Sequence, residues 1–183
     1  MKVESREVTW FGVLPYALIA AGALLRVVPH PWNFAPIGAL ALFGGAVLPG
    51  LLGLAVPLAA LALSDAVLGF YPGIAWVYGS YVLIALLGRA LGKRRTVARV
   101  VTYSLAASIL FYLVTNFGEW RGPLYPHTLA GLWSSYAAAV PFFRNTVLSD
   151  LCYSLAMFGI YAHATRIEEQ RAGRMAPASQ RTT

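Results

Sequence analysis

The chain has 183 residues, of which 58% are hydrophobic and only 11% are charged, and its formal net charge is +7. Soluble domains carry about 25% charged residues, so this composition argues against an ordinary soluble domain and predicts an integral membrane protein. The single cysteine, Cys152, excludes an intramolecular disulfide framework. The motifs GxxxxGKS/T, GxGxxG and HExxH are absent, as are Cys and His residues at metal-ligand spacing, so we expect no cofactor and no metal site.

Long stretches without charged residues predict an all-α polytopic membrane bundle. A helix needs about 20 mostly apolar residues to cross a hydrocarbon core of roughly 30 Å. In chain order, we expect six membrane-spanning segments at 10–28, 36–48, 50–70, 74–91, 97–117 and 142–164. The second segment is short, so we expect it to be tilted, broken or extended by a turn.

The regions around these segments complete the predicted organisation. Residues 1–9 form an N-terminal tail, 10–165 form one transmembrane domain, and 166–183 form a disordered C-terminal tail. Ala21-Gly22-Ala23 resembles a signal-peptide cleavage site, but the apolar run continues to Val28, so we expect a retained helix. The segment 128–140 is expected to lie at the interface or re-enter the membrane; if it spans, the count becomes seven.

The distribution of Lys and Arg predicts the orientation. With six crossings, one side receives both tails and the connection between the fourth and fifth segments, whereas the other side receives only Arg26, Arg121 and Arg144. Lys and Arg in short flanking segments favour the cytoplasmic side, so we expect both termini to be cytoplasmic. The basic charge thus follows topology, and we expect no nucleic acid partner.

Polar and ionisable residues gather on the predicted outer side. Such groups are costly at membrane depth, where they pair with one another or line a wet cavity. We therefore expect an outward-facing polar pocket. The candidate binding residues are Arg26, His30, Asn33, Asp65, Asn116, Glu119, Trp120, Arg144, Asn145 and Asp150. The alternative is structural, with the three outer arginines paired to Asp65, Glu119 and Asp150 to hold the bundle together.

Four strings carry a resemblance to a known family. RVVPHPWNFAPIGALALFGG, SDAVLGFYPG, FYLVTNFGEW and PFFRNTVLSDL resemble a bacterial family of uncharacterised membrane proteins assigned to transport, over residues 24–162. That resemblance implies a multi-pass protein of the bacterial cytoplasmic membrane.

The size, the short second segment and the long last outer connection resemble, more distantly, the S-components of energy-coupling factor transporters. The resemblance implies capture of a small vitamin-like or metal-containing molecule. It also implies a transmembrane coupling protein and ATPase subunits as partners, docked on small residues of the first helix at positions such as Ala17 and Ala21.

Three functions therefore remain open. The first is a substrate-binding transport protein in which Arg26 and Arg144 hold an anionic group, while Asp65 and Asp150 contact an amine or a metal or exchange protons. The second is a structural or assembly subunit. The third is an intramembrane enzyme that uses Asp or Glu as general acid or base; no nucleophile grouping or cofactor motif points to it, so we expect no enzyme.

Overall fold

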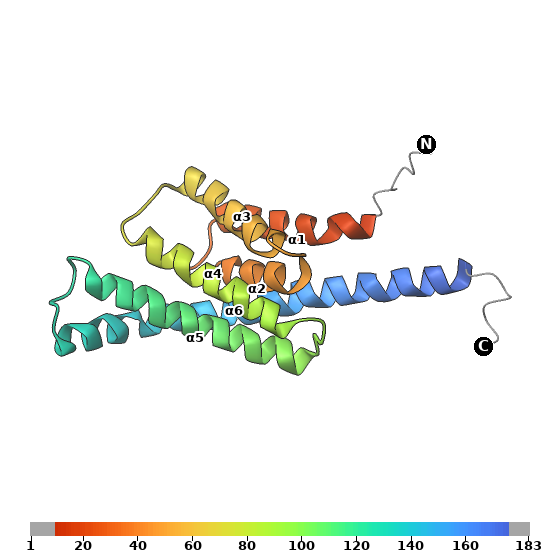
Figure 1. Cartoon of the computed structure of the whole chain (residues 1–183). Coiled ribbons are helices and arrows are strands. Elements are labelled where there is room, and N and C mark those ends of the chain that lie inside the picture. Colours follow the sequence, from red (N-terminus) through yellow and green to blue (C-terminus); the bar gives the residue numbers. More distant parts are fainter. Residues whose placement is uncertain (1–9, 176–183) are drawn as a thin grey trace.

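The computed structural model describes residues 10–175, which contain six helices and no strand (Figure 1). The predicted all-α class and the helix count are confirmed. The helices are α1 (Trp10–Val27), α2 (Ile37–Val47), α3 (Leu52–Leu68), α4 (Ile74–Leu91), α5 (Val97–Arg121) and α6 (Leu129–Met175).

The shortest helix, α2, occupies the centre of the bundle. Its residues 37–45 are all buried, and it packs against each of the other five helices. At 1.5 Å per residue its 11 residues span about 16 Å, roughly half the thickness of a bilayer core. The sequence Ile37–Val47 has no polar face because no face of α2 meets solvent.

Charged side chains from other parts of the chain lie at both ends of α2. At its C-terminal end, an Arg95 guanidinium donates to the Ala46 carbonyl, and Arg89 donates to the Gly50 carbonyl just beyond the helix. At its N-terminal end, Asp150 of α6 lies against Gly38. A cation at the C-terminus and an anion at the N-terminus both match the helix dipole.

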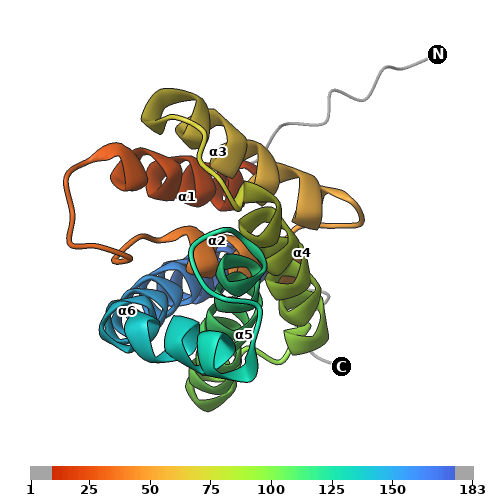
Figure 2. The ribbon, with the colours of Figure 1, turned by 90° about the vertical axis from the view of Figure 1, so that its left-hand side faces the viewer.

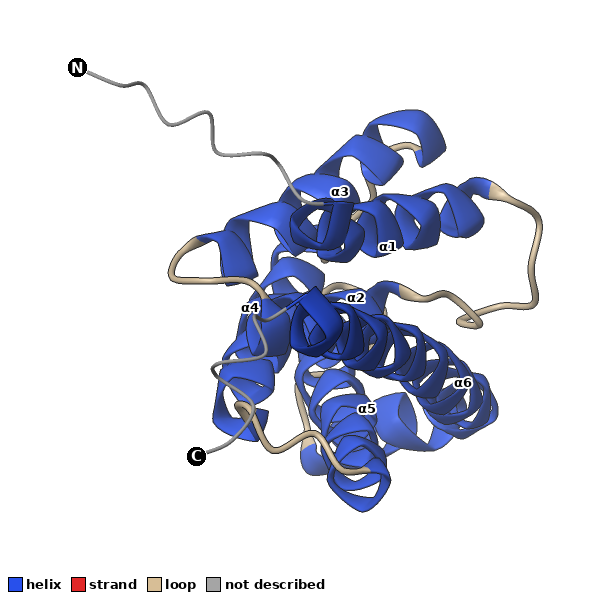
Figure 3. Ribbon diagram, turned by 90° about the vertical axis from the view of Figure 1, so that its right-hand side faces the viewer, coloured by secondary structure: helices blue, strands red, loops and turns tan. Residues whose placement is uncertain are grey.

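The connections divide between the two ends of the bundle. The links 28–36, 69–73 and 122–128 lie at one end, whereas 48–51, 92–96, the start of α1 and the finish of α6 lie at the other (Figure 1). Figure 2 views the first end and Figure 3 the second. In the described residues, the first end holds Arg26, Arg121 and Arg144 as its only Lys or Arg residues. Successive helices therefore run in opposite directions between the two ends, as the predicted segments do.

The last helix differs from the prediction at both of its ends. It begins at Leu129 instead of 142, because Pro141 lies inside the helix and does not end it. It also continues to Met175, so the described part of the predicted disordered tail, 166–175, is helical. Residues 1–9 and 176–183, predicted as tails, lie outside the described residues.

Packing on α5 explains why the segment 129–140 is helical. Tyr112 donates to the Tyr136 carbonyl at 2.6 Å, and Tyr136 donates to the Leu113 carbonyl at 2.8 Å. Ser135 adds a bond to the Asn116 carbonyl at 3.2 Å. The segment is therefore neither a separate interfacial helix nor a seventh element, but the first part of α6, laid along the C-terminal half of α5 (Figure 1).

Two helices of the described chain, α4 and α5, are long and apolar enough to cross a membrane. Their most apolar windows are only 28% and 22% buried inside the protein. Three shorter apolar helices accompany them, at 12–27, 37–47 and 52–68.

The contact between α2 and α4 predicts an effect of substitution at Gly88. A Cβ added there would lie 2.2 Å from the Leu42 carbonyl oxygen, whereas a Cβ at Gly79 of the same helix would meet no atom within 4 Å. We expect Gly88→Ala to destabilise the protein by about 1–3 kcal/mol through overpacking. Gly79→Ala is the control, and it should be neutral or stabilising by up to ~1 kcal/mol. Each purified variant is heated to a series of temperatures, and the fraction that remains monodisperse in size-exclusion chromatography gives its apparent melting temperature. Equal melting temperatures for the two variants would contradict this packing.

Candidate functional site

A cavity of about 810 Å3 opens at the end of the bundle that carries the link 28–36. All six helices contribute to its walls, and the link itself forms one side. The floor is the N-terminal turn of α2, at Ile37 and Gly38. Its charged lining residues are Arg26, Glu119 and Asp150, and its aromatic ones include Trp32, Tyr71, Tyr81 and Phe111.

Arg26 is bound to the wall of the cavity by an ion pair. Its guanidinium donates to the Asp65 carboxylate at 2.6 Å and also to the Ser64 hydroxyl. Tyr78 donates to the other carboxylate oxygen of Asp65 at 2.9 Å. Asp65 is fully buried and the Arg26 side chain is 12% exposed, so α1, α3 and α4 are joined by a mostly dehydrated cluster. The charge of Arg26 is thus balanced inside the protein.

Asp150 forms part of the cavity floor. It is 3% exposed, and Ser108 of α5 donates to its Oδ2 at 2.7 Å. A Cβ at Gly38 would lie 2.1 Å from Oδ1, so only glycine lets the carboxylate approach the first turn of α2 this closely. The first backbone N–H groups of a helix have no partner within the helix, and they favour an anion. Pro36, before α2, provides no side-chain cap, and the Asp150 carboxylate lies where such a cap would be.

Polar groups of α6 hold the link 28–36 in place. Asn145 donates to the Trp32 carbonyl at 2.9 Å, and Ser149 donates to the Ala35 carbonyl at 3.3 Å. Asn33 adopts the left-handed conformation, with φ 57°, which asparagine tolerates better than most residues. The turn that this creates leaves the Asn33 side chain exposed at the cavity wall.

His30 faces the backbone of its own link. Its Nδ1 lies 2.9 Å from the Pro31 carbonyl oxygen and its Nε2 lies 3.1 Å from the Arg26 carbonyl oxygen. A neutral imidazole donates to one of these and a protonated one to both. The ring therefore closes the turn after α1.

A second cavity of about 560 Å3 adjoins the first and lies between α5, α6 and the link. Residues that line both cavities include Asn33, Glu119 and Trp32. Glu119 is exposed, and its carboxylate makes neither a hydrogen bond nor an ion pair within the described chain. Asn116 lines the second cavity and donates to the Tyr112 carbonyl at 2.7 Å.

A family model matches most of the chain. The model for a family of unknown function, DUF6580, matches residues 7–172, which include nearly all of the six helices. The chain belongs to the DUF6580 family. No curated protein and no solved structure matches it.

The structure brings six of the ten candidate residues to the two cavities of this DUF6580 chain. These are Arg26, His30, Asn33, Asn116, Glu119 and Asp150. The other four do not line them. Asp65 lies buried behind Arg26, Asn145 braces the link, and Arg144 is exposed outside both cavities.

Trp120, the last of the four, packs at the bundle end. Its indole donates to the Pro126 carbonyl at 3.0 Å, and its ring contacts Phe117 and His127. On α1, Ala17 and Ala21 are exposed, away from the cavities; their docking role stays a prediction.

Sequence reasoning missed several residues of the site. The residues not predicted from sequence are Gly38, Tyr81 and Phe111, which line the larger cavity, and Ser108, which donates to Asp150. The serines at 104 and 108, one helical turn apart, were the available signal, because they mark the face of α5 that meets Ser154 and Asp150 of α6.

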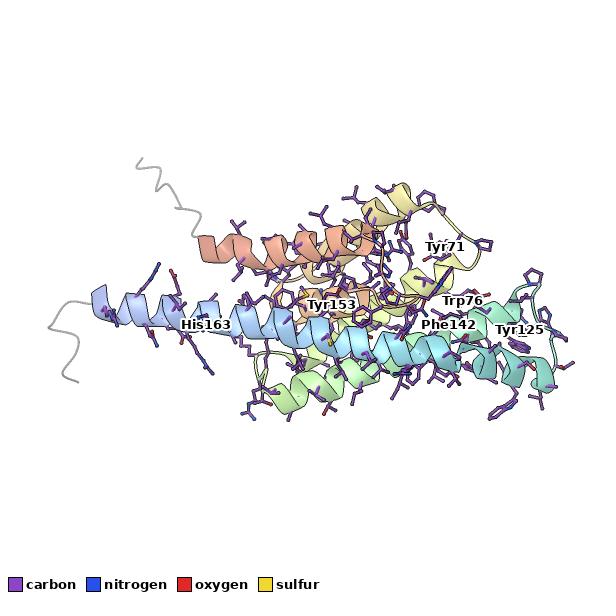
Figure 4. The ribbon with its side chains drawn as sticks, turned by 180° about the vertical axis from the view of Figure 1, so that it is seen from behind. Tyr71, Trp76, Tyr125, Phe142, Tyr153 and His163 are labelled. Carbon is purple, nitrogen blue, oxygen red and sulfur yellow. The ribbon has the colours of Figure 1, made fainter. Side chains whose placement is uncertain are left out.

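Tyr71, which lines the cavity, is an uncharged hydrogen-bonding group. Burial raises the pKa of the Tyr71 hydroxyl above its ordinary value, Asp65 raises it further, and Arg26 opposes the shift. Tyr71 therefore stays protonated at neutral pH and can donate into the cavity. Figure 4 shows Tyr71, Trp76 and Phe142 in this half of the molecule, and His163 toward the other end.

The Arg26–Asp65 ion pair predicts a stability effect. We expect Asp65→Ala to cost about 3–5 kcal/mol, because it leaves the Arg26 guanidinium without a partner in a mostly buried site. The double variant Arg26→Met/Asp65→Leu should recover much of this loss, since apolar replacement of a buried pair is often close to neutral. Chemical denaturation of the solubilised variants measures both effects. The control is Arg144→Met, which replaces an exposed arginine at the same end of the bundle. If the Asp65→Ala variant were as stable as this control, the pairing would be contradicted.

Proposed function

We propose that this protein is a multi-pass protein of the bacterial cytoplasmic membrane that captures a small molecule in the cavity at its outer end. The distant resemblance to energy-coupling factor S-components favours a role in transport. Since the chain has no ATPase motif, energised uptake would depend on a coupling protein and ATPase subunits.

The exposure of apolar side chains supports placement in a membrane. The apolar windows of α4 and α5 are mostly unburied, which is unlike the core helix of a soluble protein. Large aliphatic side chains also face outward along the bundle, such as Leu63, 70% exposed, and Ile109, 50% exposed. Patches of this kind are rare on soluble monomers. A lipid bilayer would cover them.

The observation that carries the binding proposal is the large cavity lined by charged and aromatic side chains. Small-molecule sites typically occupy about 300–1,000 Å3 and combine apolar walls with a few polar groups. The cavity of about 810 Å3 fits this class. Its walls are fixed by the Arg26–Asp65 pair and by Asp150, whereas Glu119 and Asn33 remain available to a ligand.

Two exposed tryptophans provide a matched test. Trp32, 80% exposed, lines both cavities, whereas Trp133, 76% exposed, lines neither. We expect native mass spectrometry of the protein, gently extracted from its host membrane, to show a reproducible small-molecule adduct. Trp32→Ala should remove most of this adduct because it removes one wall of the site. Trp133→Ala should retain it.

Three outcomes bear on the proposal. An adduct lost only in Trp32→Ala supports ligand capture, and co-purified ATPase subunits support transport. An adduct retained in both variants would move the binding site elsewhere. The third outcome is a protein that carries no adduct and that is not stabilised against heating by an extract of the host's small molecules. This outcome would contradict ligand capture and favour a structural subunit.

A further inference from the structure

The charges around the cavity point to one class of ligand. Arg26 is the only cation among its charged lining residues, and its charge is taken up by Asp65 behind it at 2.6 Å. The other two charged lining residues, Glu119 and Asp150, are carboxylates with no ion-pair partner in the described chain. Because Asp150 is already engaged by Ser108 and the first turn of α2, Glu119 is the group that offers negative charge to a ligand, and no free cation occurs among the described lining residues.

Other cations of the same end do not alter this balance. Arg144 is exposed and lines neither cavity. Arg121 is also exposed, with its guanidinium 5.9 Å from the centre of the Trp120 ring, and it too is outside both linings. The first turn of α2 offsets the charge of Asp150 by about half a unit, which leaves Glu119 uncompensated.

Aromatic rings surround these carboxylates. Trp32, Tyr71, Tyr81 and Phe111 line the larger cavity, and Phe142 and Phe143 line the smaller one. The faces of aromatic rings attract cations, most of all tryptophan faces, and bind organic ammonium groups in sites that exclude water. Glu119 and Trp32 both line the two cavities, so an organic ammonium ion held by the Glu119 carboxylate would share its cavity with the Trp32 ring.

From these observations we infer that the ligand is an organic cation, whose positively charged nitrogen contacts Glu119 and whose remaining body packs on the aromatic walls. This inference rests on the proposed function, and it reverses the expectation that Arg26 holds an anionic group. The cavity volume suits a molecule much larger than a bare ion.

A matched set of three probes tests this inference. Phenethylammonium, 2-phenylethanol and phenylacetate share a phenyl ring and a short chain, but are cationic, neutral and anionic at neutral pH. Their binding to the solubilised full-length protein is measured by saturation-transfer NMR titration. We expect phenethylammonium to bind at least about threefold more tightly than 2-phenylethanol, and phenylacetate to bind most weakly.

Two variants separate charge from structure. Glu119→Gln keeps the size of an exposed, unbonded side chain and should weaken phenethylammonium about three- to tenfold, with little effect on 2-phenylethanol. Glu169→Gln, at an exposed carboxylate near the other end of α6, is the control and should change neither.

The outcomes distinguish the two proposals. Equal or tighter binding of phenylacetate, or a cation preference unchanged in Glu119→Gln, overturns the organic-cation inference. In that case, an adduct that is lost in Trp32→Ala still supports ligand capture. If the native adduct is identified and carries no positive charge, the inference also fails while the proposed function stands.

Discussion

The whole arrangement depends on a short apolar helix buried at the centre of the bundle. Because α2 touches all five other helices, its polar ends must be satisfied by their side chains. Asp150 of α6 meets the first turn, and Arg95 from the link between α4 and α5 donates to the Ala46 carbonyl near the other end. Since α2 is too short to reach the end of the bundle that carries the link 28–36, the space at that end becomes the cavity, and the first turn of α2 becomes its floor.

Polar residues at the cavity end of the bundle fall into two groups that sequence alone does not separate. Arg26, Asp65 and Asp150 are engaged by other protein groups, and they fix the positions of four helices. Glu119 and Asn33 are exposed beside the opening. The structural alternative thus fits Arg26, Asp65 and Asp150, whereas binding by Glu119 and Asn33 stays a proposal. Rigid walls with free groups at the mouth are the usual arrangement for a preorganised site.

Helix positions were predictable where apolar runs end at glycine, proline or charge. The bounds 74–91 are those of α4, and α2 differs by one residue at each end from 36–48. The start of α6 was not predictable from local signals, because proline usually ends a helix. The segment before Pro141 is instead held against α5 by tertiary contacts of Tyr112, Tyr136 and Ser135. The contacts of Asp65 with Arg26 and Tyr78 depend on how three helices are rotated, which periodicity in a uniformly apolar chain does not specify.

The length of α2 also has an electrical consequence. Gly38 lies at the cavity floor, and Pro49 and Gly50, just past the other end of α2, are exposed. In the proposed orientation, only about 16 Å of low-dielectric protein then separates the two aqueous sides. In that orientation, a membrane potential of 100 mV, worth about 2.3 kcal/mol per elementary charge, would fall mainly across this thin layer. A charged ligand would reach the cavity without crossing that field, so the voltage would act on its passage inward and not on its capture.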